Sequence, residues 1–550
     1  MKRNVLKVHP ADNVIVALQN LKAGEPVRWE GVEYTPVEDI AAKHKFVATP
    51  IPAGGPVIMY GVLVGRAKTD LQPGVRIATE NITHASSEYQ LGERKTSWEK
   101  PDTTRWQDAT FNGFHRTDGS VGTANYWLVI PMVFCENRNI EVMREALVNE
   151  LGYSRPKQYN QFAGQLAALY RTGKSVEEIL QVHFESNAGK EEDTRLFKNI
   201  DGIKFLTHEG GCGGIRQDAQ ALCGLLAGYI THPNVAGATI LSLGCQNAQV
   251  PMLQEEIEKR SPGFSKPLYV YEQQKIGSEE TLLASAIRDT FAGIAKANEN
   301  ARRPAPLSKL CIGLECGASD GFSGISANPS IGYTSDLLTA LGGSVILAEF
   351  PELCGVEQEI SDRCVNVEDA TRFMGLMKTY NGLAEAAGSG FYMNPSPGNI
   401  KDGLITDAIK SAGAAKKGGT SPVVEVLDYP NKVSKPGLNL LCTPGNDVES
   451  TTAEVAAGAT IVLFTTGLGT PTGNPIAPVV KLASNTTLYN KMRDIIDINT
   501  GTVIDGEETI EEAGTRIFDY ILKVASGEEV VSAVRHGQDD FIPWKRGVSL

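Results

Sequence analysis

Residues 310–329 read LCIGLECGASDGFSGISANP, an apolar run followed at once by a loop of glycines and small polar residues. A continuous apolar run is typical of a buried parallel strand, and the loop stands where that strand would end. Similar runs lie on either side, among them YWLVIPMVF, ATILSLG and SVILAEF, and they alternate with helical stretches such as DAQALCGLLAGYI. This alternation predicts an α/β domain with a mainly parallel sheet over residues 113–390.

The flanking sequence divides the rest of the chain. Residues 391–550 repeat the alternation with VVEVLDY, LNLLCT and TIVLFTT, and a terminal helix is expected around residues 511–526. Residues 1–90 show short strands separated by Gly and Pro, which predicts a small β-rich module. Residues 91–112 are polar and lack apolar periodicity, as a linker does. The predicted fold class is therefore α/β: a small N-terminal β-rich module plus two α/β domains with mainly parallel sheets.

Composition narrows the classes of partner. The 550 residues carry 52 Lys and Arg against 65 Asp and Glu, a net charge of -13 with no large basic block, which argues against nucleic acid or an anionic membrane as partner. No apolar run is long enough to span a membrane, and the first residues lack a signal-peptide core. Nine cysteines scattered along an acidic chain favour the reducing cytoplasm. We expect a cytoplasmic homo-oligomer that acts on a small molecule.

Four cysteines share one context, at or just after the end of an expected strand: Cys135, Cys212, Cys245 and Cys316. Because strand carboxyl ends converge on the ligand crevice of an open α/β sheet, these thiols are expected to face one site. Thiolates there suit Fe²⁺, Zn²⁺ or an iron–sulfur cluster. The alternative is that each is a small buried apolar residue, which is our interpretation of the other five: Cys223, Cys311, Cys354, Cys364 and Cys442.

Three polar loops supply candidate contacts for a hydroxylated or anionic ligand. Each loop could instead be an ordinary turn or helix cap. The loop TTGLGTPTGN over residues 465–474 lacks the Lys-Ser/Thr ending of a phosphate loop, so no nucleotide site is expected. The candidate binding residues of the three loops are Ser319, Asp320, Ser323 and Asn328, then Asn394, Ser396 and Asn399, then Thr466 and Thr470.

The β-rich module contributes two further candidates, His44 and Lys45, at the start of the run HKFVATPI. Lys45 could neutralise a substrate carboxylate. A lone His is more often a structural residue than a catalytic one, and that alternative stays open for His44.

Taken together, these segments resemble the altronate dehydratase and D-galactarate dehydratase family along nearly the whole chain. The resemblance begins with a SAF-type module that carries HPADNVIVAL and AAKHKFVATPI, and continues through RTDGSVGTANYWLVIP, HEGGCGG, LGCQNAQ and GLECGASDGFSGISANPSIGYTSD. It ends with NPSPGN, GLNLLCTPGND, TTGLGTPTG and DINTGTVIDGEETIEEAG.

The resemblance implies a hydro-lyase of hexuronate catabolism, most like altronate dehydratase, that converts D-altronate to 2-dehydro-3-deoxy-D-gluconate and water. It implies Fe²⁺ or an iron–sulfur cluster as cofactor, with Mn²⁺ as another divalent candidate. Removing the C2 proton builds a dianionic enediolate, which a Lewis acid and cationic groups must hold, and the C3 hydroxyl must be protonated or metal-assisted to leave.

The resemblance also assigns roles to residues. The metal is expected near Cys212, Cys245 and Cys316, with Cys135 as a fourth candidate, and the alternative is an oxygen and histidine site on the small module. Asp320 is counted among the catalytic residues and is expected, with Asn328, to contact substrate hydroxyls. The catalytic residues from the small module are His44 as general acid or base and Lys45 as the partner of the substrate carboxylate.

Two departures from the family pattern bear on the substrate. The stretch GVRIATEN has Arg76, Ala78 and Glu80 where altronate dehydratases tend to carry histidines, and in this it is closer to galactarate dehydratases. Leu468 stands where the family usually has an Arg that can grip a carboxylate, which disfavours a diacid, although enzymes for both substrates share that Arg. D-Galactarate dehydration, a sulfolactate-type lyase and a non-catalytic sugar-acid sensor are the alternatives.

Overall fold

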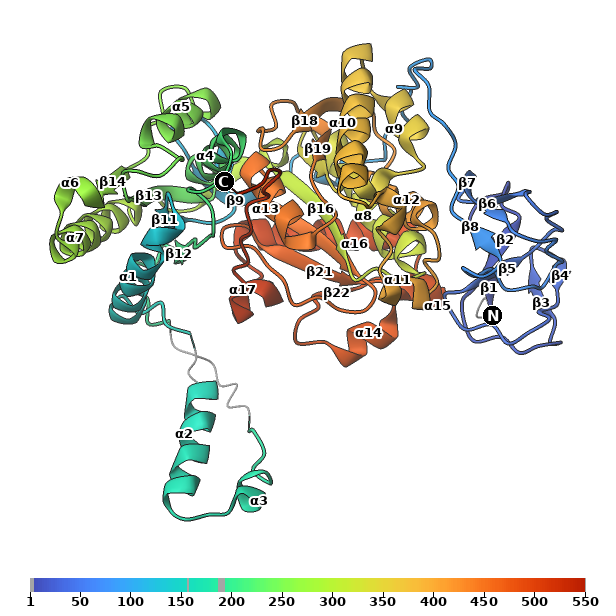
Figure 1. Cartoon of the computed structure of the whole chain (residues 1–550), viewed down its shortest axis with the longest axis horizontal. Coiled ribbons are helices and arrows are strands. Elements are labelled where there is room, and N and C mark those ends of the chain that lie inside the picture. The colour runs from blue at the N-terminus through green and yellow to red at the C-terminus, as the bar shows by residue number, and fades with distance from the viewer. Residues whose placement is uncertain (1–3, 156–157, 186–192, 550) are drawn as a thin grey trace.

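The computed structural model describes residues 4–155, 158–185 and 193–549 (Figure 1). Over these residues the chain forms an antiparallel β-rich N-terminal module and two parallel sheets, of four and seven strands, with helices. The predicted fold class is thus confirmed. Figure 1 shows the module at one end, the four-stranded sheet at the other and the seven-stranded sheet between them.

The N-terminal module is built from short antiparallel strands in two three-stranded sheets, β1-β2-β5 and β6-β7-β8, and the hairpin β3-β4. Turn residues separate the strands, and the apolar side chains of the strands face inward. The strands are β1 Val5–Leu6, β2 Val14–Ala17, β3 Val27–Trp29, β4 Val32–Tyr34, β5 Lys45–Val47, β6 Pro56–Met59, β7 Val62–Ala67 and β8 Ile82–Thr83.

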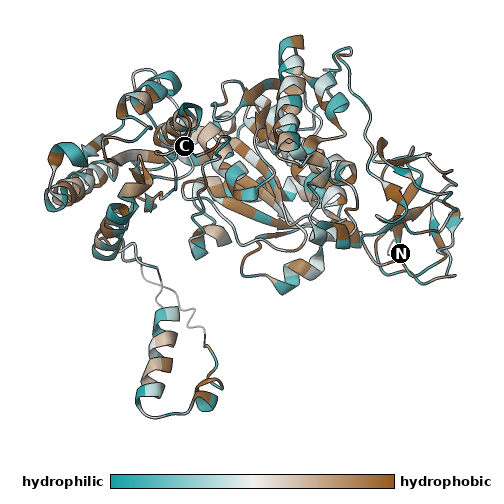
Figure 2. Cartoon of the chain, in the orientation of Figure 1, coloured by the Kyte–Doolittle hydropathy of each residue, from teal (hydrophilic) through white to brown (hydrophobic). Residues whose placement is uncertain are grey.

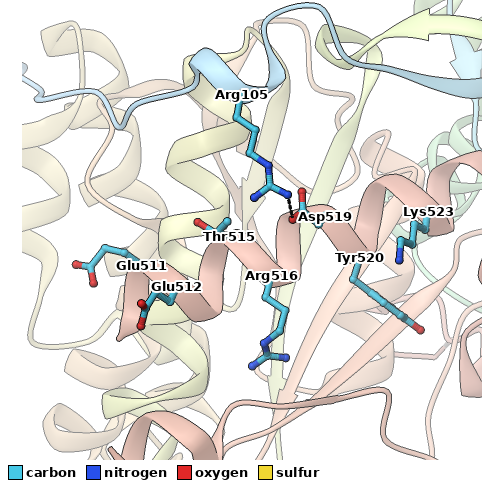
Figure 3. Close-up of a pocket in the computed structure, with 8 residues that line it drawn as sticks. All are labelled: Arg105, Glu511, Glu512, Thr515, Arg516, Asp519, Tyr520 and Lys523. Carbon is cyan, nitrogen blue, oxygen red and sulfur yellow. Dashed lines mark hydrogen bonds and ion pairs between the residues drawn. The ribbon is translucent and has the colours of Figure 1, made fainter. Parts of the chain in front are cut away.

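The predicted linker, residues 91–112, runs along the large domain and is held there. It contains the short helix η1 (Thr104–Trp106), where Arg105 forms an ion pair of 2.6 Å with Asp519 on α16 (Ile510–Ser526). Figure 3 shows this pair in a shallow hollow of charged side chains along α16. The end of the linker enters β9 (Thr110–His115), which pairs with β10 (Val121–Gly122) and β15 (Arg303–Pro306).

The second domain is a parallel sheet in the order β12-β11-β13-β14. Its central strands are continuous apolar runs and are fully buried, as expected for a parallel sheet covered on both faces. Its strands are β11 Tyr126–Pro131, β12 Gly202–Phe205, β13 Val235–Ser242 and β14 Leu268–Glu272. Its helices are α1 Asn137–Glu150, α2 Gln158–Arg171, α3 Val176–Ile179, α4 Arg216–Thr231, α5 Val250–Arg260, α6 Gln273–Ile276 and α7 Glu279–Ala297.

The third domain is a parallel sheet in the order β18-β19-β17-β16-β20-β21-β22. Its apolar strands form the brown centre of the molecule in Figure 2. Its strands are β16 Cys311–Gly317, β17 Ser344–Leu347, β18 Val423–Asp428, β19 Gly437–Cys442, β20 Ile461–Thr466, β21 Val479–Ala483 and β22 Ile498–Asn499. The division expected at residue 390 falls inside this sheet, because strands from both sides of it pair with each other.

Helices cover both faces of this sheet. The terminal helix expected around residues 511–526 is α16, which begins with a capping box between Thr509 and Glu512. The other helices are α8 Ala327–Ala340, α9 Glu357–Arg363, α10 Val367–Ala386, α11 Pro397–Lys401, α12 Asp407–Ala414, α13 Asp447–Ala457, α14 Thr486–Lys491, α15 Gly501–Asp505 and α17 Ser532–His536. No helix of the described residues is long and apolar enough to cross a membrane.

Candidate active site

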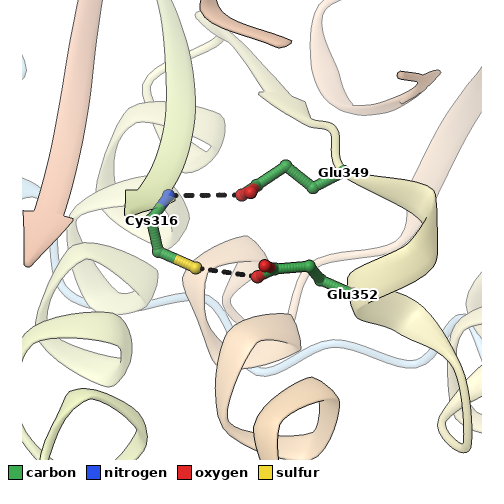
Figure 4. Close-up of side chains that lie close together, drawn as sticks. All are labelled: Cys316, Glu349 and Glu352. Atoms are coloured by element: carbon green, nitrogen blue, oxygen red, sulfur yellow. Dashed lines mark hydrogen bonds between the residues drawn. The ribbon is translucent and has the colours of Figure 1, made fainter. Parts of the chain in front are cut away.

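A buried group of potential metal ligands lies at the carboxyl ends of β16 and β17. Cys316 ends β16, Glu349 follows β17, and Glu352 stands in the short helix η5 (Phe350–Leu353). One ligand atom from each lies within 4.8 Å of the others, and each residue is at most 2% exposed. Figure 4 shows both carboxylates pointing at Cys316: Glu352 accepts from its Sγ at 3.0 Å and Glu349 from its backbone N at 3.2 Å.

The backbone at Glu349 is unusual and helps to place its side chain. Its φ of 58° puts it in the left-handed region, which is uncommon for a residue with a Cβ and tends to occur at functional sites. Its backbone N–H donates to Thr443 Oγ1 at 2.8 Å, which ties the turn to the end of the neighbouring strand β19. The chain therefore turns sharply and directs the carboxylate back across the sheet edge.

Two buried lysines contact the group. Lys417, in the short helix η7 (Ala415–Gly418), donates to Cys316 Sγ at 2.9 Å and forms an ion pair with Glu349. Lys410 on α12 forms an ion pair of 2.6 Å with Glu352. Burial alone would lower both lysine pKa values, but the neighbouring acidic groups raise them above the ordinary value. Both side chains are therefore ammonium ions, and both neutralise part of the negative charge of the site.

Acidic groups nevertheless outnumber these lysines. Burial and then the carboxylate of Glu349 raise the pKa values of Glu315 and Glu454, and burial raises the pKa of Asp447 to about 7. Burial opposes ionisation of Glu352 as well, but Lys410 and Lys417 bring its pKa below the usual value. In the absence of a cation, several of these carboxyl groups therefore hold protons.

This donor set fits a divalent transition metal. Burial, Glu349 and Glu352 raise the pKa of Cys316 well above that of a free thiol, and a bound cation reverses this effect because it favours the thiolate. One thiolate and two carboxylates suit Fe²⁺, Mn²⁺ or Zn²⁺. The surplus of acidic groups offsets the charge of such an ion. Cys316, Glu349 and Glu352 are therefore the residues that would hold the metal.

The β-rich module docks beside this group through a second polar cluster. Lys43 lies 3.0 Å from Asp320, in the loop after β16, and 3.0 Å from Asp402. Next to it, His44 Nε2 lies 3.0 Å from the carbonyl oxygen of Lys401, and the neighbouring Lys45 donates to a backbone carbonyl at 2.7 Å. The predicted catalytic residues of the module thus contact Lys401 and Gly403, and the neighbouring Lys43 is the residue that pairs with Asp320.

Lys45 has the most strongly shifted pKa in this second polar cluster. It is 1% exposed, and burial lowers the pKa of its ammonium group to about 7. Burial also lowers the pKa of His44. At neutral pH a substantial fraction of Lys45 is therefore a neutral amine, which can accept a proton.

Asp320 is held on all sides. Its carboxylate accepts from the backbone N–H of Ser323 at 2.9 Å, from Ser484 Oγ at 2.8 Å and from Asn485 Nδ2 at 3.1 Å, besides its ion pair with Lys43. A fully buried carboxylate with this many donors is well suited to order the loop around it.

The loop around residues 394–399 joins the two clusters. Asn394 Oδ1 accepts from Lys410 at 3.1 Å, and Asn399 Nδ2 donates to the carbonyl of Ser319 at 2.8 Å. Ser396 caps α11 in a reciprocal pair with Asn399. Ser319 Oγ is buried and has no hydrogen-bond partner within the described part of the chain, so it is available to a ligand.

The remaining predicted binding residues form hydrogen bonds with neighbouring parts of the protein. Asn328 donates to the carbonyl of Gly413 at 3.1 Å and accepts from Thr465 at 2.6 Å. Thr466 Oγ1 accepts from the backbone N–H of Gly469 at 2.9 Å, and Thr470, the next residue, is half-buried. These contacts shape the loops at the strand ends.

The four strand-end cysteines are divided between the two sheets. Cys316 lies in the seven-stranded sheet, whereas Cys135, Cys212 and Cys245 are exposed on loops of the four-stranded sheet. Among the described residues, the ligand group around Cys316 includes none of the other three. The reason is topological, because strand ends converge only within one sheet.

Sequence reasoning missed the partners of Cys316. Glu349 directly follows the apolar run SVILA, so the strand-end argument used for the cysteines applied to it equally. Lys410, Lys417 and Asp447 gave no such signal. The two lysines lie in a stretch that reads as an ordinary helix, and Asp447 stands beside the helix-capping Asn446.

Comparison with known proteins agrees with this architecture. Three family models match successive parts of the chain: the altronate/galactarate dehydratase SAF domain at residues 3–85, the D-galactarate dehydratase/altronate hydrolase second domain at 113–298, and the D-galactarate/altronate dehydratase C-terminal domain at 307–549.

Similarity to characterised proteins extends over the full length. The chain is 32% identical to an altronate dehydratase of Bacillus subtilis (strain 168), with all of both chains covered. It is 31% identical to an altronate dehydratase of Escherichia coli (strain K12) over 99% of both chains. It is also 31% identical to the galactarate dehydratase (L-threo-forming) of the same organism, over 95% of this chain and 93% of that one. The chain therefore belongs to the altronate/galactarate dehydratase family of hydro-lyases.

Proposed function

We propose that the protein dehydrates D-altronate to 2-dehydro-3-deoxy-D-gluconate and water with the help of a divalent metal, Fe²⁺ in the first place. The buried group of Cys316, Glu349 and Glu352 carries this proposal, because its donors fit such an ion. When bound, the metal supplies a Lewis acid for the charge that builds up on the substrate. The full-length similarity to two altronate dehydratases supports altronate as the substrate.

Lys45 is the residue best suited to take the C2 proton. Its pKa of about 7 places it where a general base works at neutral pH, and its nitrogen is buried beside the loop of Asp320. This role differs from the carboxylate contact expected from sequence, for which a permanently charged ammonium would serve better. His44, at the same edge of the module, is the residue placed to contact the departing C3 hydroxyl, and because burial lowers its pKa it does so near neutral pH mainly as the neutral imidazole.

Substrate hydroxyl groups are expected to contact the free Oγ of Ser319, which lies between the two clusters. Asp320, Ser323, Asn328, Ser396, Asn399 and Thr466 hold the surrounding loops through their own hydrogen bonds. Asn394 and Thr470 line the same strand-end region. On this proposal the substrate lies between the module and the seven-stranded sheet.

D-Galactarate is the second candidate substrate, since the galactarate dehydratase of Escherichia coli is almost equally similar. Leu468 leaves the second carboxylate of a diacid without an Arg partner, although enzymes for both substrates share that Arg.

The deciding experiment incubates anaerobic, Fe²⁺-loaded protein with D-altronate, D-galactarate and sulfolactate, and measures the 2-keto-3-deoxy product or released sulfite. We expect turnover of altronate above the other two. Turnover of galactarate or sulfolactate alone would reassign the substrate. Binding of sugar acids with no turnover of any would point to a sensor instead of an enzyme.

A further inference from the structure

The proposed dehydration needs an acid, because the C3 hydroxyl leaves as water only when it receives a proton. Lys410 and Lys417 use their ammonium groups in ion pairs with Glu352 and Glu349, so their protons are already engaged. Burial lowers the pKa of His44, so its ring is mainly neutral near neutral pH. A buried carboxyl group that keeps its proton is therefore a better source.

Asp407 is a buried carboxyl group that the proposed reaction does not yet use. It is the first residue of α12 and is 0% exposed, and neither of its carboxyl oxygens has a hydrogen-bond partner among the residues that the structure describes. Burial raises its pKa well above the ordinary value, and the carboxylate of Glu352 adds to this effect. Cys354, Lys410 and Asn394 act in the opposite direction, but burial outweighs them. Asp407 is therefore a protonated carboxylic acid at neutral pH.

The segment that leads into α12 connects Asp407 to the proposed base. Lys45 Nζ donates to the carbonyl oxygen of Gly403 at 2.7 Å, and Thr406 Oγ1 donates to the carbonyl oxygen of Val64 in the module at 2.8 Å. The four residues from Gly403 to Asp407 span at most ~14 Å even when extended. Figure 1 shows α12 on the side of the third domain that is next to the module. The proposed base and the carboxyl group thus lie along one short segment.

The same helix faces the metal group one turn later. Residues three and four apart are neighbours on a helix surface, so Asp407, Lys410 and Ser411 lie on the same side of α12. On that side Lys410 pairs with Glu352 at 2.6 Å and donates to Asn394 Oδ1 at 3.1 Å. Ser411 Oγ and Asn394 Nδ2 are buried and, within residues 4–155, 158–185 and 193–549, have no hydrogen-bond partner. Asp407 therefore stands among polar groups that are free to contact a ligand.

Other buried carboxyl groups of the site are held in different places. Glu454 Oε1 accepts from a backbone N–H of β16 at 3.0 Å, and Glu315 stands within β16 itself. Asp447 packs on the end of that strand, where a Cβ on Gly317 would lie 2.0 Å from its Oδ2. These three groups are on the sheet, whereas Asp407 is next to the contacts with the module.

The surroundings of Asp407 can stabilise its carboxylate once the proton has gone. Asn394 Nδ2 is a nearby donor, and the ammonium group of Lys410 lies one turn along the helix. The first turn of α12 also provides the positive end of the helix dipole. The group can therefore alternate between the protonated and the ionised form.

We propose that Asp407 is the general acid of the dehydration and donates its carboxyl proton to the C3 hydroxyl as the C3–O bond breaks. This inference rests on the proposed function. The C2 proton passes to Lys45, and the electron pair of the C2–H bond forms the C2=C3 double bond of an enol. The electron pair of the C3–O bond leaves with the hydroxyl, which takes the proton of Asp407 and becomes water. Lys45 then loses a proton to solvent and Asp407 gains one, so both return to their first state.

A change of leaving group separates an acid from a structural residue. Asp407→Asn keeps the shape of the side chain but has no carboxyl proton to donate. With the sugar acid that the wild type dehydrates, kcat should fall by at least ~100-fold. With the 3-deoxy-3-fluoro analogue, whose fluoride leaves without a proton, the loss should stay below ~10-fold because the contribution of the acid is no longer needed.

Two controls accompany this comparison. Thermal unfolding of Asp407→Asn should resemble that of the wild type, because no hydrogen bond of the described residues is broken. Asp102→Asn, at an exposed position of the linker, should match the wild type with both substrates. An equal loss of kcat with both substrates in Asp407→Asn, or no loss with either, would show that Asp407 is not the acid.

A second measurement does not depend on turnover. The infrared difference spectrum between the wild type and Asp407→Asn at neutral pH should contain the C=O band of a protonated carboxyl group, which shifts in D₂O. If this band is absent, Asp407 is ionised and cannot be the acid, whatever the substrate is. A wild type that shows the band but dehydrates no sugar acid would contradict the proposed function, and this inference with it.

Discussion

Lys417 Nζ lies 2.9 Å from Cys316 Sγ and also forms an ion pair with Glu349, so one buried ammonium group contacts two of the three potential metal ligands. The lysine comes from η7, and the ligands come from the ends of β16 and β17. The contact therefore couples the charge balance of the site to the packing of distant parts of the chain. The following predictions start from this balance.

Removing one ligand should empty the metal site. In Cys316→Ala or Glu352→Gln, tightly bound metal per chain should fall by more than ~10-fold, since even outer partners of ligands contribute 10–100-fold to affinity. Metal analysis after gel filtration measures this, with Cys223→Ala as the control for loss of a buried thiol. If both ligand variants keep their full metal content, the metal binds at other residues.

Replacing Lys417 should make stability depend on metal. Lys417→Met leaves Glu349 buried without its ion pair, which costs about 3–5 kcal/mol in the apoprotein. Fe²⁺ or Mn²⁺ should restore more of the free energy of unfolding than it adds to the wild type, because the cation replaces the lost positive charge. Thermal unfolding with and without metal tests this, and Lys259→Met, at an exposed ion pair, is the control. Equal stabilisation of all three proteins would contradict it.

Activity should rise with pH through about 7. Lys45 accepts a proton only as the neutral amine. At pH values below the pKa of Lys45 the ammonium form dominates, so kcat decreases there. Lys45→Arg cannot deprotonate and should lose at least 100-fold in kcat, since general bases contribute roughly 10²–10⁴-fold. The exposed Lys68→Arg, in the same module, should keep the wild-type profile. If Lys45→Arg keeps the same increase of kcat with pH, another group is the base.

The docking of the module should depend on Lys43. Lys43→Met leaves the fully buried Asp320 without its cation, so we expect a loss of about 3–5 kcal/mol in stability. Lys22→Met, at an exposed ion pair with Asp39, should cost far less, because solvent screens that pair. Denaturant unfolding compares the two, and similar values would mean that the Asp320 contact does not hold the module.

Position 468 should influence the choice between altronate and a diacid. Leu468→Arg supplies a guanidinium group for a second carboxylate, and one charge-assisted contact of ~1.5–3 kcal/mol raises the kcat/KM ratio of galactarate to altronate by roughly 10–100-fold. Leu468→Met, which adds no charge, should leave the ratio unchanged. If the ratio is the same in both variants, this loop does not influence the choice of substrate.

Local pattern was enough to predict part of the site. The apolar run before Cys316 predicted a strand and placed the thiol at its end, and the structure has β16 ending there. The polar loop after this strand supplied Asp320 as a candidate, and the start of the run HKFVATPI supplied His44 and Lys45. In the structure, Lys43 beside them pairs with Asp320. The sequence pattern could not show which strand ends belong to the same sheet. For this reason it did not reveal that the four cysteines are divided between two sheets.

The sequence by itself determined the class of fold, the parallel strands, the small β-rich module and the family, because each depends on periodicity or on ordered motifs along the chain. Only the tertiary structure decided which groups surround Cys316. Glu349, Lys410 and Lys417 are far from it in sequence, and their charges act through space in a buried region where water cannot screen them. The pKa values of Lys45 and Asp447 depend on burial for the same reason, so the chemistry of this site arises only when the chain is folded.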